Sequence, residues 1–148
     1  AKWMWMPQRM WSKNGRKEEN LLPLRCDLSN PSPSLGWNCK ERLSLLERGP
    51  THTVMALALI HHLVIGNNVP MSSFAEFLSS LCSFLVIEFV PKSDSQVQRM
   101  LETREDIFPD YHLNGFEKEF SKNFVIMKKI KVQSSERVIF LLKTKNNS

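Results

Sequence analysis

The sequence predicts an α/β fold in which a mostly parallel sheet ends in an antiparallel C-terminal hairpin. Two observations indicate this class. From residue 21 to residue 122, apolar strand-like runs alternate with helical patterns, which is typical of parallel strands joined by crossover helices. The last two strand-like runs, 124–132 and 138–144, are separated only by a polar turn and are expected to pair antiparallel. A content of 42% hydrophobic and 24% charged residues agrees with a globular domain.

The first strand and the first helix are predicted before residue 50. Residues 21–27 have the composition of a short strand, and a loop rich in Asn, Pro and Ser follows. Residues 37–48 are predicted to form a helix because their apolar side chains recur at helical spacing. Trp37, Leu43 and Leu46 are the residues expected on the buried side of this helix.

The central part of the pattern contains two buried strands and a helix between them. Residues 53–60 are almost continuously apolar, as in a central parallel strand covered on both faces. A helix is predicted after Pro70, where phenylalanines and leucines recur three or four positions apart. Residues 84–90 form the second apolar strand, which ends at Pro91.

Two short helices are predicted before the hairpin. Ser93 or Asp94 is expected to cap the first of them, because short polar side chains accept hydrogen bonds from the first free backbone amides. The second spans residues 114–122 and places Phe116 and Phe120 four positions apart on one side.

Charge is unevenly distributed, although the formal net charge is only +5. Residues 1–20 carry five basic and two acidic side chains, and residues 117–148 carry eight basic and three acidic ones. The middle, 21–116, has seven basic and ten acidic residues. Basic ends are compatible with nucleic-acid binding, but a solvated strand pair and a loose tail are the usual explanation of such charge runs and are favoured here. An acidic centre would suit a cationic ligand if it formed a cleft.

Two parts are predicted from composition, a basic N-terminal segment over 1–20 and an α/β part over 21–148. The first contains three of the four tryptophans and three of the seven methionines among its basic residues. Such a mixture is compatible with a segment at a membrane interface or against a partner. A terminal segment whose packing surface lies elsewhere or is missing is favoured, because the run shows no clean period of 3.6 residues.

A cytoplasmic protein with free thiols and no transmembrane segment is expected. The longest apolar stretch, 54–65, is interrupted by His61 and His62, whereas a spanning helix needs about 20 apolar residues. Three scattered cysteines are too few for a disulfide scaffold. Adjacent histidines cannot both face one ion in regular structure, so no metal site is predicted. No two glycines form GxG, so a phosphate-binding loop of that kind is not expected either.

A binding edge is predicted where the parallel strands end. In open parallel sheets, ligands bind outside the carboxyl ends of the strands. The residues at those ends are Asp27, the segment 58–62 and Glu88, which would bring two carboxylates and a histidine pair together. Taken singly, Asp27 is equally explained as a loop cap and Glu88 as a residue facing a helix N-terminus.

Six runs taken together resemble a known family. They are DLSNPSP at 27–33, GW at 36–37 with ERLSL at 41–45, ALALIHHL at 56–63, IGNNVP at 65–70, IEFVPK at 87–92 and REDIFPDY at 104–111. In this order they are similar to a little-characterised, partly nodulation-type group of class I S-adenosylmethionine-dependent methyltransferases. The resemblance covers about 21–148. It implies the carboxyl-terminal part of a doubly wound, Rossmann-like sheet of seven strands, from the third strand onward, with the last strand antiparallel.

The resemblance also implies roles for individual residues. Asp27 would accept a hydrogen bond from the adenine amino group of S-adenosylmethionine, with Leu28 near the ring. Ala58 and His61 would lie by the methionine and sulfonium end. The residues on the side of the methyl acceptor would be His62, Asn67, Asn68 and Glu88. Because alignment supplies much of the rate of an in-line methyl transfer, no dedicated catalytic nucleophile is expected.

Two departures from the family pattern affect the expected function. The family's Gly-rich turn after its first strand and the acidic residue that holds the ribose have no counterpart here. The residue that opens the strand before Ala56 is usually acidic, whereas this chain has Thr51-His52-Thr53. We therefore expect the carboxyl-terminal part of a methyltransferase with an unknown acceptor, inactive without a missing N-terminal half or an oligomer partner. The alternative is a non-catalytic interaction protein whose basic ends bind a partner or nucleic acid.

Overall fold

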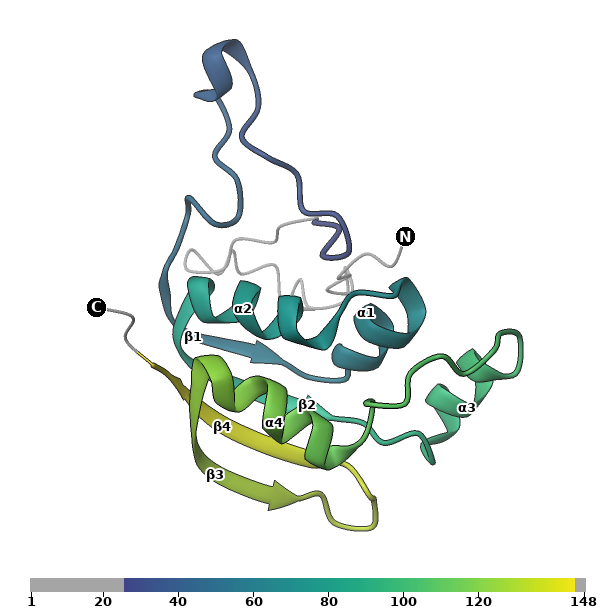
Figure 1. Cartoon of the computed structure of the whole chain (residues 1–148). Coiled ribbons are helices and arrows are strands. Elements are labelled where there is room, and N and C mark those ends of the chain that lie inside the picture. The colour runs from purple at the N-terminus through teal and green to yellow at the C-terminus, as the bar shows by residue number, and fades with distance from the viewer. Residues whose placement is uncertain (1–25, 146–148) are drawn as a thin grey trace, which may run out of the picture. The chain divides into compact units, whose positions relative to one another are not determined.

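A four-stranded mixed sheet with helices packed on it forms the larger of two units in the computed structural model (Figure 1). The structure describes residues 26–145. The first unit comprises 1–45 and the second 46–148. The N-terminal segment 1–20 and most of the strand predicted over 21–27 lie outside the described residues. The predicted α/β class is confirmed.

The order of the strands in the sheet is β1-β2-β4-β3. Their bounds are Thr51–Ala56 for β1, Cys82–Phe89 for β2, Phe124–Lys131 for β3 and Val138–Thr144 for β4. The C-terminal hairpin is confirmed. β1 and β2 pair in parallel, but β4 pairs antiparallel with both β2 and β3. The prediction of a mostly parallel sheet is therefore wrong for the described residues, because the hairpin inserts its second strand directly beside β2.

Four α-helices connect these strands. Their bounds are Ile60–Asn67 for α1, Met71–Leu81 for α2, Ser95–Leu101 for α3 and Leu113–Asn123 for α4. α1 and α2 follow one another between β1 and β2, and α3 and α4 lie between β2 and β3. α2 and α4 lie side by side over one face of the sheet, where Phe74 meets Phe120 edge to face at 6.3 Å between ring centroids (Figure 1). The predicted helix after Pro70 is confirmed.

A cluster of buried phenylalanines joins α4 to the sheet. The ring of Phe116 lies 4.2 Å from that of Phe120, 4.8 Å from that of Phe140 and 5.4 Å from that of Phe89, centroid to centroid. All four side chains are buried. Phe89 belongs to β2 and Phe140 to β4, so a single aromatic residue of α4 packs on both central strands. Such contacts stabilise the fold by area burial and by ring geometry.

The apolar run at 53–60 does not form a central strand covered on both faces, as the sequence predicted. β1 lies at the edge of the described sheet and ends at Ala56. Ala58 has a φ of 49°, in the left-handed region, and Ile60 begins α1. The run is thus split by a bend into a largely exposed strand and the start of a buried helix, which continuous hydropathy cannot distinguish.

The helix predicted over 37–48 is also absent from the described chain. Only Trp37–Cys39 form a short 3-10 turn, and Trp37 is 85% exposed rather than buried. Leu43 and Leu46 are exposed as well. Gly36 has a φ of 88°, and Leu35 bridges to Arg42 across the loop. These left-handed and bridging conformations direct the backbone into a loop despite the helical spacing of the leucines.

The aromatic cluster gives a stability prediction. Phe116→Ala is expected to lower the free energy of unfolding by about 3–5 kcal/mol, because it leaves a cavity between α4 and both central strands. Urea unfolding followed by circular dichroism measures this loss. Trp37→Ala, at an exposed position, is the control and should change stability by less than about 0.5 kcal/mol. Equal losses in the two variants would contradict the assignment of the cluster as the core.

Candidate functional site

The carboxyl ends of β1 and β2 meet at one edge of the sheet because these two strands are parallel. Glu88, near the end of β2, accepts a hydrogen bond at Oε2 from the backbone N–H of Ala58, with 2.7 Å between the heavy atoms. The Glu88 side chain is only 12% exposed. A carboxylate that accepts a backbone amide makes a strong, charge-assisted bond. It stabilises the left-handed bend between β1 and α1, a conformation that residues with a Cβ rarely adopt.

Arg137 extends this contact into a network. Its Nη1 lies 3.4 Å from Glu88 Oε1, and its Nε donates to Asp94 Oδ2 at 2.7 Å. Asp94 also accepts from the backbone N–H of Gln96 at 3.0 Å, which confirms the predicted cap of α3. The network therefore connects the end of β2, the start of α3 and the residue that precedes β4.

The network shifts the pKa values of its members. The hydrogen bond from the Arg137 guanidinium lowers the pKa of the Asp94 carboxyl below its usual value, and the charge of nearby His61 contributes in the same direction. The same hydrogen bond raises the pKa of Arg137. Asp94 therefore stays ionised, and the arginine stays charged, across the physiological pH range.

Two of the predicted cofactor residues, Ala58 and His61, lie close to this network. His61 is buried in the first turn of α1, and its ring centroid lies 4.0 Å from that of His62. The charge of His61 acts on Asp94, so His61 lies within electrostatic range of the network. The structure thus brings the bend at Ala58, the first turn of α1 and the Glu88 carboxylate to one edge, as the sequence predicted for these three.

The asparagines predicted on the acceptor side have different surroundings. Asn67 donates from Nδ2 to the backbone oxygen of His62 at 2.6 Å and so stabilises the end of α1. Asn68, in left-handed conformation with a φ of 57°, accepts from Arg104 Nη2 at 2.5 Å. Arg104 also donates from Nη1 to the backbone oxygen of Ile65. Asn68 is therefore oriented by a residue of the loop that follows α3.

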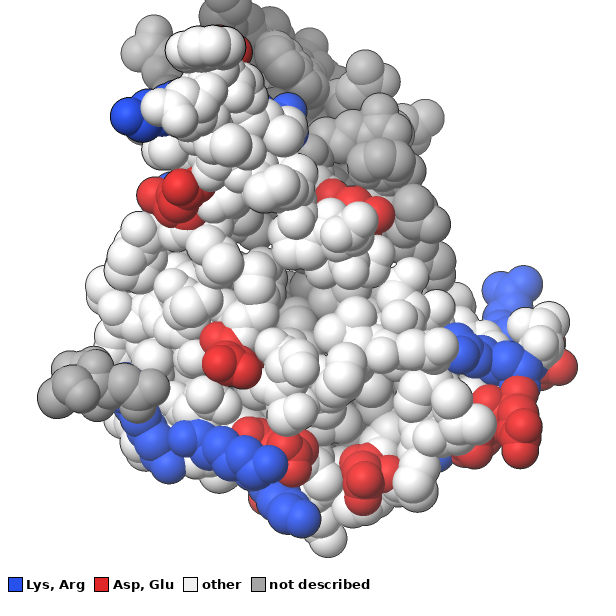
Figure 2. Space-filling model, turned by 45° about the horizontal axis from the view of Figure 1, so that its top comes forward, with Lys and Arg blue, Asp and Glu red and all other residues white. Residues whose placement is uncertain are grey.

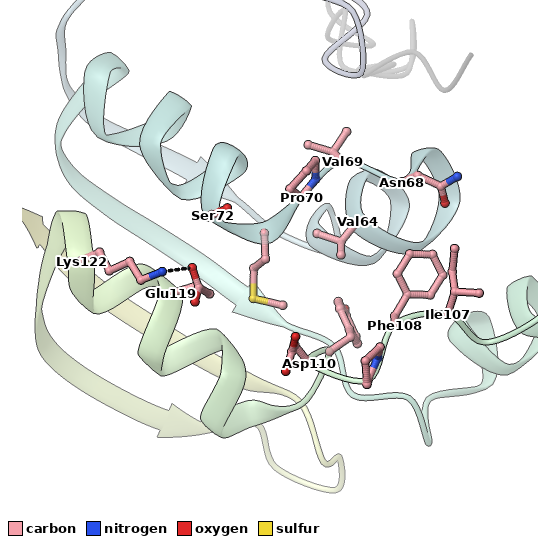
Figure 3. A pocket seen from close by; sticks show the side chains of 13 residues that line it. Val64, Asn68, Val69, Pro70, Ser72, Ile107, Phe108, Asp110, Glu119 and Lys122 are labelled. Carbon is pink, nitrogen blue, oxygen red and sulfur yellow. Dashed lines mark hydrogen bonds and ion pairs between the residues drawn. The ribbon is translucent and has the colours of Figure 1, made fainter.

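A hollow of about 470 Å³ opens beside Asn68 (Figure 3). It lies between the end of α1, the start of α2, α4 and the loop 107–111. Its apolar lining comes from Val64, Val69, Pro70, Met71, Ile107, Phe108 and Pro109. Polar groups include Asp110, for which the structure gives no ion-pair partner among the described residues, and Glu119, whose Oε2 lies 2.6 Å from Lys122 Nζ. The volume of the hollow falls within the range of small-molecule sites.

Gly115 allows the loop 107–111 to lie against α4. A Cβ at this position would come within 2.1 Å of the backbone oxygen of Asp110, a distance that only a shift of the backbone would relieve. Tyr111 fixes the other side of the loop, since its hydroxyl donates to the backbone oxygen of Val90 at 2.8 Å. The loop that lines the hollow is therefore held by contacts with α4 and with Val90, the residue that follows β2.

The predicted acceptor-side residues are only partly brought together. Of the four, Asn68 lines the hollow, whereas His62, Asn67 and Glu88 do not belong to its lining. Glu88 instead takes part in the network at the edge of the sheet. The residues predicted to form one acceptor surface therefore lie in different places of the second unit. Asn68 lies at the hollow, and Glu88 lies in the network at the edge of the sheet.

Asp27 and Leu28, the other two predicted cofactor residues, belong to the first unit of the chain. Asp27 Oδ1 accepts from the backbone N–H of Ser29 at 2.9 Å and from Ser29 Oγ at 2.6 Å. These hydrogen bonds lower the pKa of Asp27. The interpretation of Asp27 as a loop cap is confirmed, and its predicted role toward adenine remains a prediction.

Sequence reasoning missed the two arginines that orient the candidate site. Arg137 was counted only as part of the hairpin turn, although its partners lie 49 and 43 positions away along the chain. Arg104 stood in a run used for the family resemblance, with no role assigned to it. The sequence did contain a signal for such arginines. Carboxylates occur at the ends of predicted strands, and a partly buried carboxylate needs a cationic or amide partner.

The described residues contain no group of three or more His, Cys, Asp or Glu side chains placed to hold a metal ion. None of the helices in this part of the chain has the length and apolarity required to cross a membrane.

Comparison with known proteins shows a similarity to a nodulation protein. The chain is 38% identical over 130 residues to the nodulation protein NoeA of Rhizobium meliloti (strain 1021). The matched region is 88% of this chain but only 27% of that protein, so the chain spans about a quarter of the length of its relative. No protein-family model matches the chain. No solved structure matches it either.

The ionised state of Asp94 gives a prediction of pH dependence. Asp94→Asn keeps a capping side chain but removes the charge that pairs with Arg137, so we expect a loss of about 1–3 kcal/mol in the free energy of unfolding near neutral pH. Because the folded-state pKa of Asp94 is lowered, its contribution is complete above the unfolded value of 3.8 and is lost as the pH falls through the lower folded value.

Urea unfolding of both proteins at a series of pH values measures this effect. The difference between them should be constant from about pH 7 to pH 5 and should shrink below that range. Asp110→Asn, which breaks no ion pair among the described residues, is the matched control and should change the free energy of unfolding near neutral pH by less than about 0.5 kcal/mol. A difference between wild type and Asp94→Asn that grows on acidification would contradict the assignment.

Proposed function

We propose that this chain is the carboxyl-terminal part of a class I S-adenosylmethionine-dependent methyltransferase with a Rossmann-like sheet. The observation that carries the proposal is the hydrogen bond between Glu88 and the Ala58 amide. It fixes the bend after β1 at the carboxyl edge of the parallel strand pair, which is where open α/β sheets bind their ligands. The resemblance of six runs to that family supports the same function, and the similarity to NoeA supports a nodulation-type relative.

The bend at Ala58 is the part of this edge that would accommodate the cofactor. Ala58 has a small side chain, and its amide is held by Glu88, so the bend can approach a bound molecule closely without changing conformation. Both carboxylate oxygens of Glu88 contact groups of the protein. Glu88 is therefore a positioning residue in this proposal rather than a direct ligand of the cofactor.

The chain's residues would act by holding two reactants in line. When bound, S-adenosylmethionine supplies an electrophilic methyl group. Ala58 and His61, both in the second unit, would border its methionine end. Asn68, oriented by Arg104, would contribute to the acceptor side at the hollow. Such alignment accounts for much of the rate of a displacement reaction, so the proposal requires no nucleophilic side chain.

The alternative of nucleic-acid binding through the C-terminal lysines has less support. The strand register places Lys128 and Lys129 on opposite faces of β3, opposite Leu141 and Phe140 respectively. Lys129 forms an ion pair with Glu117. On the face seen in Figure 2, basic side chains form separate groups with acidic side chains among them. A continuous basic surface, which phosphate binding would favour, is therefore not seen on that face.

Binding of S-adenosylmethionine tests the proposal. Isothermal titration is performed on the full chain alone and on the chain mixed with the part of NoeA that lies outside the matched region. We expect binding in the mixture. Glu88→Ala should weaken it about tenfold, since the loss of a hydrogen bond worth about 1–1.5 kcal/mol frees the bend at Ala58. Glu76→Ala, on the exposed side of α2, is the matched control.

Two results would refute this function. One is the absence of heat with millimolar S-adenosylmethionine in both preparations. The other is equal weakening of binding by Glu88→Ala and Glu76→Ala, which would remove the edge of the sheet from the site. S-adenosylhomocysteine, the product of methyl transfer, should compete for the same site.

A further inference from the structure

The two faces of the sheet have different surroundings in the second unit. Phe89 of β2 contacts Phe116 of α4, so the side chains that share its face point toward the helices. Leu85 and Ile87 share that face, because alternate residues of a strand point the same way, and both are fully buried. Val86 lies between them and therefore points to the opposite face, away from α4.

An apolar row crosses this opposite face. The strand register aligns Met55 of β1 with Val86 of β2, and Val86 with Leu141 of β4. Met55 is 65% exposed, and Val86 and Leu141 are partly exposed. On either side of this row, β3 adds two exposed apolar side chains to the same face, Val125 and Ile130. We refer to this surface, formed by Met55, Val86, Leu141, Val125 and Ile130, as the open face.

An exposed surface of this kind is unusual for a protein that functions alone. Exposed apolar side chains that gather on one surface often mark an interaction site. Parallel strand pairs such as β1 and β2 are, in addition, nearly always covered on both faces. β1 also ends the described sheet, so one of its edges has no strand partner among the described residues. These features together indicate a surface that another polypeptide covers.

The charges at the open face define the partner. Lys128 pairs with Leu141 across the hairpin, and Lys143 pairs with Phe84 of β2, so both lysines share this face. Glu88, which also points to this side, is engaged by Ala58 and Arg137. The open face is therefore apolar with a positively charged flank toward β3 and β4. A complementary partner needs an apolar stripe with acidic residues along one side.

We infer that the open face binds an amphipathic helix with an acidic flank, contributed by polypeptide that corresponds to the part of NoeA outside the matched region. The matched region is 27% of NoeA, so that relative carries ample further chain to supply such a helix. A second copy of this chain fits less well, since it would bring another positively charged flank toward the same surface. The inference concerns the open face alone and does not depend on the proposed methyl transfer.

Complex formation tests the inference. The full chain is mixed with a polypeptide that contains the parts of NoeA outside the matched region, and its size is measured by light scattering after gel filtration. We expect a one-to-one complex. Hydrogen exchange should show new protection in β1, β2 and β4. Leu141→Asp, at the centre of the open face, should weaken the complex at least tenfold.

Charge reversal and a control keep the test decisive if Leu141→Asp does not fold. Lys128→Glu and Lys143→Glu lie at exposed strand positions and should each weaken the complex several-fold while leaving the circular dichroism spectrum unchanged. Glu76→Lys, on the helical side, should have no effect. Failure to form the complex, a complex insensitive to all open-face variants, or a dimer of this chain that Leu141→Asp dissociates would overturn the inference. A complex that forms but does not bind S-adenosylmethionine would refute the methyltransferase proposal alone.

Discussion

The hydrogen bond from the Ala58 amide to Glu88 is the contact on which the candidate site depends. It joins residues 30 positions apart and determines how the chain leaves β1 and enters α1. His61, in the first turn of α1, takes its position from that bend. Arg137 lies against the same carboxylate, so the charge of Glu88 is compensated within the protein. Arg137, which precedes β4, therefore stabilises the edge of the sheet at which β1 and β2 end.

The aromatic core explains why the hairpin can provide that arginine. Phe116 packs on both Phe89 and Phe140, which places β4 beside β2 and fixes the register of the hairpin. This register brings residue 137 to the level of Glu88 and Asp94. A core contact on the helical face of the sheet therefore determines the electrostatics at its edge, although the two regions share no residue.

The two faces of the sheet are both apolar, but only one is covered by α2 and α4 (Figure 1). Burial of the helical face stabilises the second unit. The open face retains apolar side chains that strands of a fully covered sheet would bury. The candidate cofactor edge and the open face meet at Glu88, whose side chain points to the open side. Covering of that face by a partner would therefore also exclude water from the network around Arg137.

Local patterns in the sequence determined β2, α2, α4 and the C-terminal hairpin, because their apolar periodicity agrees with the packing of the folded chain. They also located Ala58 and Glu88 at one edge, since parallel strands end together. The helix predicted over 37–48 failed because left-handed residues overrode its spacing. Only the tertiary structure decided that β4 lies beside β2, that β1 is exposed and that Arg137 meets Glu88. These features arise from contacts between residues far apart in the chain, which hydropathy and spacing do not encode.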